Sequence, residues 1–441
     1  MSFDLILIDG QVMTGSNNIP TLMDIGIKDG KIISIGNLKK ELSLKVVNCS
    51  NLVILPGVID TQVHFRDPGL THKEDIESGS KSAVLGGITA FCEMPNTKPL
   101  TVSEFELRKK IEKSEKVSWC DYSFFVGATS KNISNLNVYE KLTGCAGVKI
   151  FMGSSTGELL VHDYEMLLKI MENGSRRVAV HAEDEERLKD RFKFYKKYND
   201  ARYHPTWRDP KSALLATKKI MDIANKANRP LHILHISSAQ EMKLLQKKSR
   251  LISVEVTPQH LTLNSPECYN KLGTYAQMNP PIRSKYHQDE LWKGIENGTV
   301  DVIGSDHAPH TIEEKQIEYP NSPSGMPGTQ TMLPLMLNEV SKNKIKLSKL
   351  VSLLCTRPAE IYKMKNRGKI EEGYLASLTV IDLNLVKSLK KSDIKSRCAW
   401  SPFTDKLLKG WPVMTIINGD IAMQNQTLRN RPKVQEIIFE N

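Results

Sequence analysis

The sequence lacks any long apolar run. No stretch of its 441 residues approaches the roughly 18 consecutive apolar residues that a membrane-spanning helix needs. Apolar residues make up 40% of the chain and charged residues 25%, which is ordinary for a soluble globular protein. The opening segment MSFDLILIDG has no basic region followed by an apolar one, so we expect no secretory signal. These absences predict a soluble, cytoplasmic protein without a membrane partner.

Paired cysteines are also absent. The seven cysteines are odd in number, widely scattered and never spaced CxxC, which fits free thiols in a reducing compartment. The net charge of +11 could indicate a nucleic-acid partner. The lysines, however, are spread in pairs such as Lys109-Lys110 without interleaved aromatic residues. We therefore interpret them as solvated helix faces and expect no nucleic-acid partner.

Short apolar runs alternate with helical stretches through the middle of the chain. There are eight such runs: VILPGVIDTQVH, ITAFCEMPN, DYSFFVGAT, GVKIFMG, RRVAVHAED, PLHILHISS, LISVEVTPQH and VDVIGSDHAPH. This alternation is typical of parallel βα units. Eight units over residues 54–365 predict an α/β fold, a (β/α)8 barrel somewhat larger than the typical ~250 residues.

Both ends of the chain are rich in strand and turn signals. In residues 1–53, apolar runs surround Asp29-Gly30, a dipeptide suited to a tight hairpin turn. In residues 366–441, LASLTVIDLN is a strand candidate and VMTIINGDIAMQ pairs two apolar runs across a turn. We expect the two ends to form one small β-sandwich domain beside the barrel.

Residues at the carboxyl ends of barrel strands line the active site of this fold. The eight runs place His64, Asn96, Lys149, His181, His235 and Asp306 at or near such ends. In the first run, period-two alternation puts Asp60, Gln62, His64 and Arg66 on one side of an extended segment. We expect these side chains to converge on one site.

His181 and His235 each end an apolar run. Either one alone is more often a hydrogen-bonded histidine of the core. Together, at equivalent strand ends, they favour metal coordination, because neutral imidazole is a common zinc ligand. Asp306, in GSDHAPH, can bind a metal or transfer a proton, and its simpler interpretation is a helix cap. The histidines that follow at 307 and 310 favour the first interpretation.

Lys149 has apolar neighbours on both sides in GVKIFMG, so its ammonium is either paired or discharged. Alone, it would be interpreted as a buried salt-bridge partner. Beside the other candidate ligands, carbamylation becomes the favoured hypothesis. A neutral amine that takes up carbon dioxide becomes a carboxylate-like ligand that can bridge two cations.

The ordered motifs resemble those of a known family. D-x-x-x-H-x-R, EMPNT, GVKIF, HAED, HISS, TPQHL, MNPPIR and SDHAPH resemble the amidohydrolase superfamily and, within it, the dihydroorotases of pyrimidine biosynthesis. The resemblance runs along nearly the whole chain, and the β-rich ends resemble the composite sandwich domain of these proteins. It implies reversible hydrolysis of the cyclic amide of dihydroorotate to N-carbamoyl-aspartate.

The resemblance also implies residue roles. Zinc would be the cofactor, as one or two ions: His181 and His235 would hold one ion, His64 and Asp306 the other, and carbamylated Lys149 would bridge them. Asp306 would also deliver a proton to the leaving nitrogen. The implied substrate-binding residues are Arg66, Asn96, His310 and Asn279, the last of them in MNPPIR. The first three match positions that hold the substrate carboxylate, for which a planar guanidinium is well suited.

Gln62 departs from the His-x-His pattern of the family. A neutral amide oxygen is a far weaker zinc ligand than imidazole. Because three protein ligands still suffice for a catalytic zinc, we predict an active enzyme whose first metal is bound more weakly. Two smaller departures from the family pattern are Gln259, in place of a histidine, and GMPGTQT, in the Pro/Gly/Ser-rich loop after the eighth run. Neither position is an expected metal ligand, so both bear on substrate specificity more than on the chemistry. That loop is a candidate for a mobile lid.

Two other functions remain open from the sequence. One is a hydantoinase- or allantoinase-type cyclic amidase, whose rings lack the carboxylate that Arg66 would bind. The other is a non-catalytic, dihydroorotase-like partner of aspartate transcarbamoylase, which Gln62 favours and the other retained ligands oppose. The expected partners are therefore a small-molecule substrate, further copies of the chain in a homo-oligomer, and aspartate transcarbamoylase.

Overall fold

The central part of the chain forms a barrel. The computed structural model describes residues 2–153 and 157–440, and eight parallel strands pair in chain order from β6 to β13. They are β6 (Val58–Val63), β7 (Ile88–Glu93), β8 (Asp121–Gly127), β9 (Cys145–Phe151), β10 (Val178–His181), β11 (Leu231–Ile233), β12 (Ile252–Val256) and β13 (Val302–Ile303). The His64 N–H donates to the His307 carbonyl at 2.7 Å, and Val63 bridges His307, so the last strand's end meets the first. The predicted (β/α)8 fold is confirmed.

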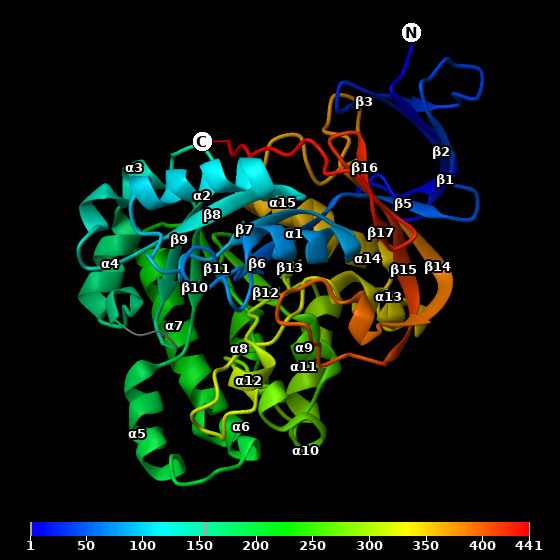
Figure 1. Cartoon of the computed structure of the whole chain (residues 1–441). Helices are drawn as coiled ribbons and strands as arrows, with labels where there is room; N and C mark the ends of the chain where they lie inside the picture. The colour runs from blue at the N-terminus through cyan, green and yellow to red at the C-terminus, as the bar shows by residue number, and fades with distance from the viewer. Residues whose placement is uncertain (1, 154–156, 441) are drawn as a thin grey trace.

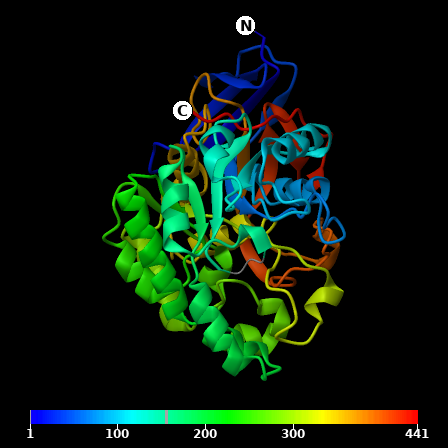
Figure 2. The same cartoon turned by 90° about the vertical axis from the view of Figure 1, so that its left-hand side faces the viewer.

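Helices follow the strands and cover the outside of the barrel (Figures 1 and 2). They are α1 (Ile76–Leu85), α2 (Glu104–Val117), α3 (Leu136–Tyr139), α4 (Tyr164–Glu172), α5 (Glu185–Tyr195), α6 (His204–Trp207), α7 (Pro210–Lys226), α8 (Ala239–Leu245), α9 (Pro258–Thr262), α10 (Glu267–Leu272), α11 (Lys285–Glu296), α12 (Ile312–Lys315), α13 (Met332–Ser341), α14 (Leu347–Val351) and α15 (Arg357–Tyr362). Among the described residues, no helix combines the length and apolarity that crossing a membrane requires.

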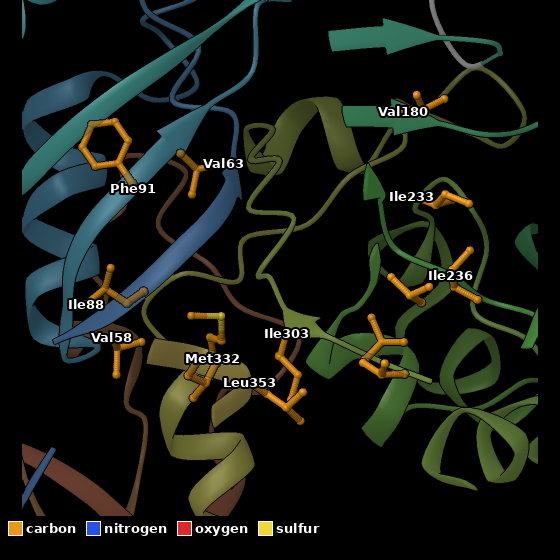
Figure 3. Close-up of a cluster of buried hydrophobic side chains, with 14 of the residues drawn as sticks. Val58, Val63, Ile88, Phe91, Val180, Ile233, Ile236, Ile303, Met332 and Leu353 are labelled. Atoms are coloured by element: carbon orange, nitrogen blue, oxygen red, sulfur yellow. The ribbon is translucent and has the colours of Figure 1, made fainter. Parts of the chain in front are cut away.

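The main core lies between the strands and these helices. Val58 and Ile88 point outward from β6 and β7, and Ile303 of β13 lies near Met332 of α13 (Figure 3). All four side chains are fully buried. Burial of one such side chain stabilises the fold by roughly 1.5–3 kcal/mol. Because strand residues alternate in direction, an apolar residue facing the helices leaves its neighbour facing the barrel interior.

Both chain ends build one β unit, as expected, and its strands are hydrogen-bonded in a single nine-stranded sheet. The strands are β1 (Leu5–Val12), β2 (Thr21–Lys28), β3 (Lys31–Gly36), β4 (Val46–Asn48), β5 (Val53–Pro56), β14 (Leu378–Ser388), β15 (Leu407–Ile417), β16 (Asp420–Gln424) and β17 (Thr427–Leu428). The ends join where β5 pairs antiparallel with β14. This sheet lies at the upper right of Figure 1.

The first apolar run of the sequence is shared between the two sheets. Its first part is β5, and β6 begins directly after Gly57. A Cβ on Gly57 would lie 2.7 Å from the Ser377 carbonyl oxygen, so a glycine is needed where the chain passes between the sheets. At the other end, the C-terminal segment returns to the barrel, where the Ile437 N–H donates to the Tyr122 carbonyl at 2.8 Å.

Candidate active site

One pocket of about 200 Å³ is lined by every predicted metal-binding and substrate-binding residue, but not by Asp60. It is lined by Gln62, His64, Arg66, Asn96, Lys149, Phe151, His181, His235, Asn279, Asp306, Ala308, His310, Ser324 and Gly325. Arg66, His235 and Asp306 have φ angles of +62°, +39° and +44°, a left-handed region that is strained for residues other than glycine. Such strain is concentrated at functional sites, where the surrounding structure holds it in place.

His181 and His235 form a buried imidazole pair. His181 Nδ1 lies 3.0 Å from His235 Nε2, and His181 Nε2 lies 2.8 Å from Glu183 Oε2. Because a carboxylate only accepts, the Nε2–H of His181 donates to Glu183 and leaves a lone pair on Nδ1. Burial lowers the pKa of both imidazoles, so both are neutral at pH 7. His235 Nδ1 is buried without a partner.

Glu183 is itself held in place. It forms a buried ion pair with the Arg208 guanidinium. Burial alone would raise the pKa of Glu183, but Arg208 and His181 hold it well below its ordinary value. A carboxylate that orients a ligating histidine in this way is the usual outer partner of a metal site.

Lys149 lies inside the barrel on β9. Val148 and Ile150 point outward into the helix layer, while Lys149 and Phe151 line the pocket. The ammonium lies 4.5 Å from the Phe151 ring centre. Burial lowers the pKa of Lys149 from 10.5 to about 7, against the opposing charges of Asp306 and Glu255. A large fraction of the amine is therefore neutral at pH 7.

The Asp306 carboxylate contacts two side chains: Gln62, which lies in β6, and His64, which follows β6. Gln62 Nε2 donates to Asp306 Oδ1 at 2.8 Å, and His64 Nε2 lies 3.3 Å from the same oxygen. On the other side of the ring, His64 Nδ1 lies 2.7 Å from Asn96 Oδ1. An amide oxygen only accepts, so Nδ1 carries the proton and Nε2 presents a lone pair toward Asp306. The amide oxygen of Gln62 is buried without a partner.

Asp60 does not join this group, and its predicted convergence with Gln62, His64 and Arg66 was wrong. Its carboxylate accepts the Ser305 N–H at 3.0 Å and the Thr329 hydroxyl at 2.9 Å, behind the pocket wall. The pairing of β6 with β7 shifts register between Asp60 and Val63, which breaks the simple alternation. Burial raises the pKa of Asp60 to about 6.

The pocket has a cationic end. The buried guanidinium of Arg66 donates through Nε to the Pro309 carbonyl at 3.2 Å, and its Nη2 lies 3.3 Å from His310 Nε2. Burial lowers the pKa of Arg66 only to about 10, so the group stays charged at pH 7. Asn279 lies in the same pocket, with its Oδ1 2.9 Å from His204 Nε2.

The loop after β13 lies over the pocket, which Ser324 and Gly325 help to line. The buried ammonium of Lys315 donates to the carbonyl oxygens of Pro323 and Gly325 at 2.8 and 3.1 Å. Lys315 belongs to the same segment, so these hydrogen bonds tie the backbone of the candidate lid together. Its movement remains a prediction.

Two pairs of candidate ligand atoms in the pocket are spaced like neighbouring ligands of one divalent metal ion. Two ligands of a tetrahedral zinc with bonds of 2.0–2.1 Å are about 3.3 Å apart, close to the 3.0 Å of His181–His235 and the 3.3 Å of His64–Asp306. In the His64–Asp306 pair, the Nε2 lone pair faces a carboxylate oxygen, an arrangement that a cation stabilises, whereas a neutral His235 can donate its Nε2–H to the Nδ1 lone pair of His181. Across residues 2–153 and 157–440, however, no three His, Cys, Asp or Glu side chains gather as one metal-holding group.

Comparison with known proteins assigns the family. The family model described as "Amidohydrolase family" matches residues 53–422. The chain belongs to the amidohydrolase family. A protein named dihydroorotase from Pyrococcus furiosus is 34% identical to this amidohydrolase, covering 98% of its chain and 96% of the relative. A dihydroorotase from Brevibacillus brevis is 32% identical, covering 96% and 99%.

The amidohydrolase also resembles solved structures along its whole length. An L-hydantoinase (dihydropyrimidinase) from Arthrobacter aurescens superimposes with a TM-score of 0.94 at 25% identity, covering 99% of each chain. The likeness extends to the β unit as well as the barrel, because nearly every residue of both chains is matched. The predicted combination of barrel and terminal β unit is therefore an arrangement that solved structures share.

Sequence reasoning missed two residues of the amidohydrolase site. Glu183 stands two residues after His181 in HAED, and an alternation argument could have placed both side chains on the same face. Lys73, whose ammonium lies 3.1 Å from His310 Nδ1, had no such signal, because 237 residues separate the two in the chain.

Proposed function

We propose that this amidohydrolase is a dihydroorotase, which reversibly hydrolyses the cyclic amide of dihydroorotate to N-carbamoyl-aspartate in pyrimidine biosynthesis. The observation that carries the proposal is the buried, charged Arg66 beside His310, in one pocket with the histidines, Lys149 and Asp306. A guanidinium suits the carboxylate of this substrate. The full-length relatives named dihydroorotase support the same substrate.

We infer that zinc is the metal and that His181, His235 and carbamylated Lys149 hold it. The neutral amine of Lys149 would attack carbon dioxide, form an N–C bond and release a proton, and the pKa of about 7 supplies that neutral amine. A bound metal ion would lower the pKa of water and polarise the ring carbonyl. His64 and Asp306 would hold a second, weaker ion, because Gln62 replaces one ligand and uses its amide N–H₂ on Asp306.

The protein's own side chains would orient the ring and move protons. Arg66, His310 and Asn96 would bind the carboxylate at the cationic end, and Asn279 would contact the ring. Asp306 would take the proton of the attacking water and deliver it to the ring nitrogen as the C–N bond breaks. The loop that carries Ser324 lines one side of the pocket, and its closure over the substrate would limit the entry of bulk water.

Two alternative functions are separated by one experiment. The protein is purified without added zinc, its metal content is measured, and hydrolysis of dihydroorotate, hydantoin and allantoin is assayed in parallel. Dihydroorotate turnover with bound metal supports the proposal. Turnover of hydantoin or allantoin alone would instead support the cyclic amidase that the hydantoinase-like structure suggests. Neither metal nor turnover would support a non-catalytic partner of aspartate transcarbamoylase.

We also propose that the protein works in the cytoplasm, since its seven cysteines are all buried and free. Assembly as a homo-oligomer, with or without aspartate transcarbamoylase, is part of the same proposal. Sedimentation of the purified protein, alone and mixed with aspartate transcarbamoylase, tests both associations.

A further inference from the structure

His310 has contacts on both sides of its ring. Its Nε2 lies 3.3 Å from Arg66 Nη2 and 3.1 Å from the Ser324 carbonyl oxygen, at the pocket. Its Nδ1 lies 3.1 Å from Lys73 Nζ, in the loop between β6 and α1. Lys73 does not line the pocket itself. Its direct contact toward the pocket is with the His310 ring.

The contacts of Lys73 and Ser324 decide which nitrogen of His310 carries the proton. An ammonium only donates and a carbonyl oxygen only accepts, so Lys73 requires the lone pair on Nδ1, and the Ser324 carbonyl requires the N–H of a neutral ring on Nε2. Burial lowers the pKa of His310 to about 3, so the ring is neutral at pH 7. Arg66 Nη2 and His310 Nε2 are then two donors 3.3 Å apart, which cannot bond to each other. The Nε2–H donates to the Ser324 carbonyl oxygen at 3.1 Å, so an anion bound beside Arg66 would share this N–H with Ser324 or replace that contact.

The position of Lys73 is held from a second side. Its Nζ lies 2.9 Å from Glu314 Oε1, and Glu314 Oε2 accepts the Thr311 N–H at 3.0 Å in the capping box of α12. The Lys73 side chain is 13% exposed, against 57% for its neighbour His72. Lys73 is thus a partly buried and anchored cation, unlike the exposed Lys109 on α2.

We propose that Lys73 is a positioning residue that sets the specificity of the pocket for a carboxylate. By donating to His310 Nδ1, it keeps the N–H of Nε2 on the pocket side, next to the Arg66 guanidinium. Without that donor, Nδ1–H could turn to Glu314 Oε2, which lies 3.6 Å away. Nε2 would then present a lone pair to the substrate carboxylate and repel it. The choice of dihydroorotate as substrate rests on the proposed function, whereas the tautomer does not.

The first test measures the tautomer. Nitrogen-15 NMR of labelled histidine distinguishes a protonated Nε2 from a protonated Nδ1, and the His310 signals are assigned by their loss in His310→Gln. We expect Nε2–H in the wild type and in Lys73→Arg, and a shift toward Nδ1–H in Lys73→Met. Nδ1–H in the wild type, or an unchanged tautomer in Lys73→Met, would overturn the inference.

The second test measures ligand affinity. In Lys73→Met we expect orotate, a planar ring with the same carboxylate, to bind about 10- to 100-fold more weakly by calorimetry. The KM for dihydroorotate should rise by a similar factor while kcat changes little, because the lost interaction is uniform binding. Lys73→Arg should restore most of the affinity. Lys109→Met, a change of an exposed lysine on α2, is the control for removal of a lysine.

The outcomes separate the two proposals. A wild type that binds orotate but turns over no dihydroorotate would refute the proposed function and leave the role of Lys73 intact. A wild type that is active, together with a Lys73→Met variant of unchanged orotate affinity and KM, would refute the role of Lys73 alone. A folded Lys73→Met variant that loses kcat with unchanged KM would also count against it.

Discussion

The amide Nε2 of Gln62 donates a hydrogen bond to Oδ1 of Asp306 at 2.8 Å. The family resemblance implies a metal-binding histidine at this position. Gln62 is instead a hydrogen-bond donor to another candidate ligand, Asp306. The carboxylate oxygen that Gln62 and His64 share is oriented without a cation. This half of the pocket is therefore held together by hydrogen bonds between its own side chains.

Replacing Gln62 with histidine should add a metal ion. We expect about one tightly held zinc per chain in the wild type and about two in Gln62→His, because imidazole is the stronger zinc ligand. Metal content after dialysis against a weak chelator, measured by mass spectrometry, checks this. Gln246→His, at an exposed position after α8, controls for zinc bound by any added histidine. Two equally tight ions in the wild type would contradict the prediction.

Removal of the Lys149 amine should abolish metal retention. In Lys149→Ala we expect zinc to be lost on dialysis and dihydroorotate hydrolysis to fall by at least about 100-fold, more than the loss of an outer partner causes. Growth with carbon-13 bicarbonate should give one carbamate NMR signal in the wild type and none in the variant. Lys169→Ala, on the exposed side of α4, is the control. A Lys149→Ala protein with full activity and its metal would refute the bridging role.

Loss of the Glu183 carboxylate should weaken the metal without emptying the site. Glu183→Gln removes the acceptor that fixes the His181 tautomer and also leaves Arg208 without its charge partner. Zinc affinity should fall about 10- to 100-fold, as measured by competition with a coloured chelator. Glu185→Gln, in the first turn of α5, removes a nearby carboxylate outside the pocket. Equal effects of the two substitutions would show that Glu183 has no special role.

The stability of the metal-free protein should depend on pH through Lys149. Its pKa is about 7 in the folded state and 10.5 when unfolded. Between these values, unfolding takes up a proton, so the contribution of Lys149 to the free energy of unfolding rises with pH from about 7 to 10.5. Denaturant titrations of the wild type and Lys149→Met across this range should show the extra slope only in the wild type. Parallel curves would mean that Lys149 stays charged in the folded protein.

Much of the site could be predicted from the sequence, because its members stand at similar places in a repeated unit. His181 and His235 end apolar runs, and a parallel barrel brings the ends of all its strands to one rim. The same logic found Asp306 after the last strand of the repeat, and alternation beyond the first strand found Arg66, whereas His310 came from the family resemblance. It failed at Asp60, because the register shift next to β7 depends on how two strands pair. Pairing is not visible in the alternation of one strand.

The sequence alone determined the barrel and the set of side chains that face its mouth. Both follow from the order of apolar runs and polar strand ends, because alternation and the βα repeat are local properties of the chain. Only the tertiary structure decided what those side chains touch. The donation from Gln62 to Asp306, the support of His181 by Glu183 and Arg208, and the Lys73–His310 contact all depend on distances between separate loops. Such distances are set by the packing of the whole barrel, so no local pattern encodes them.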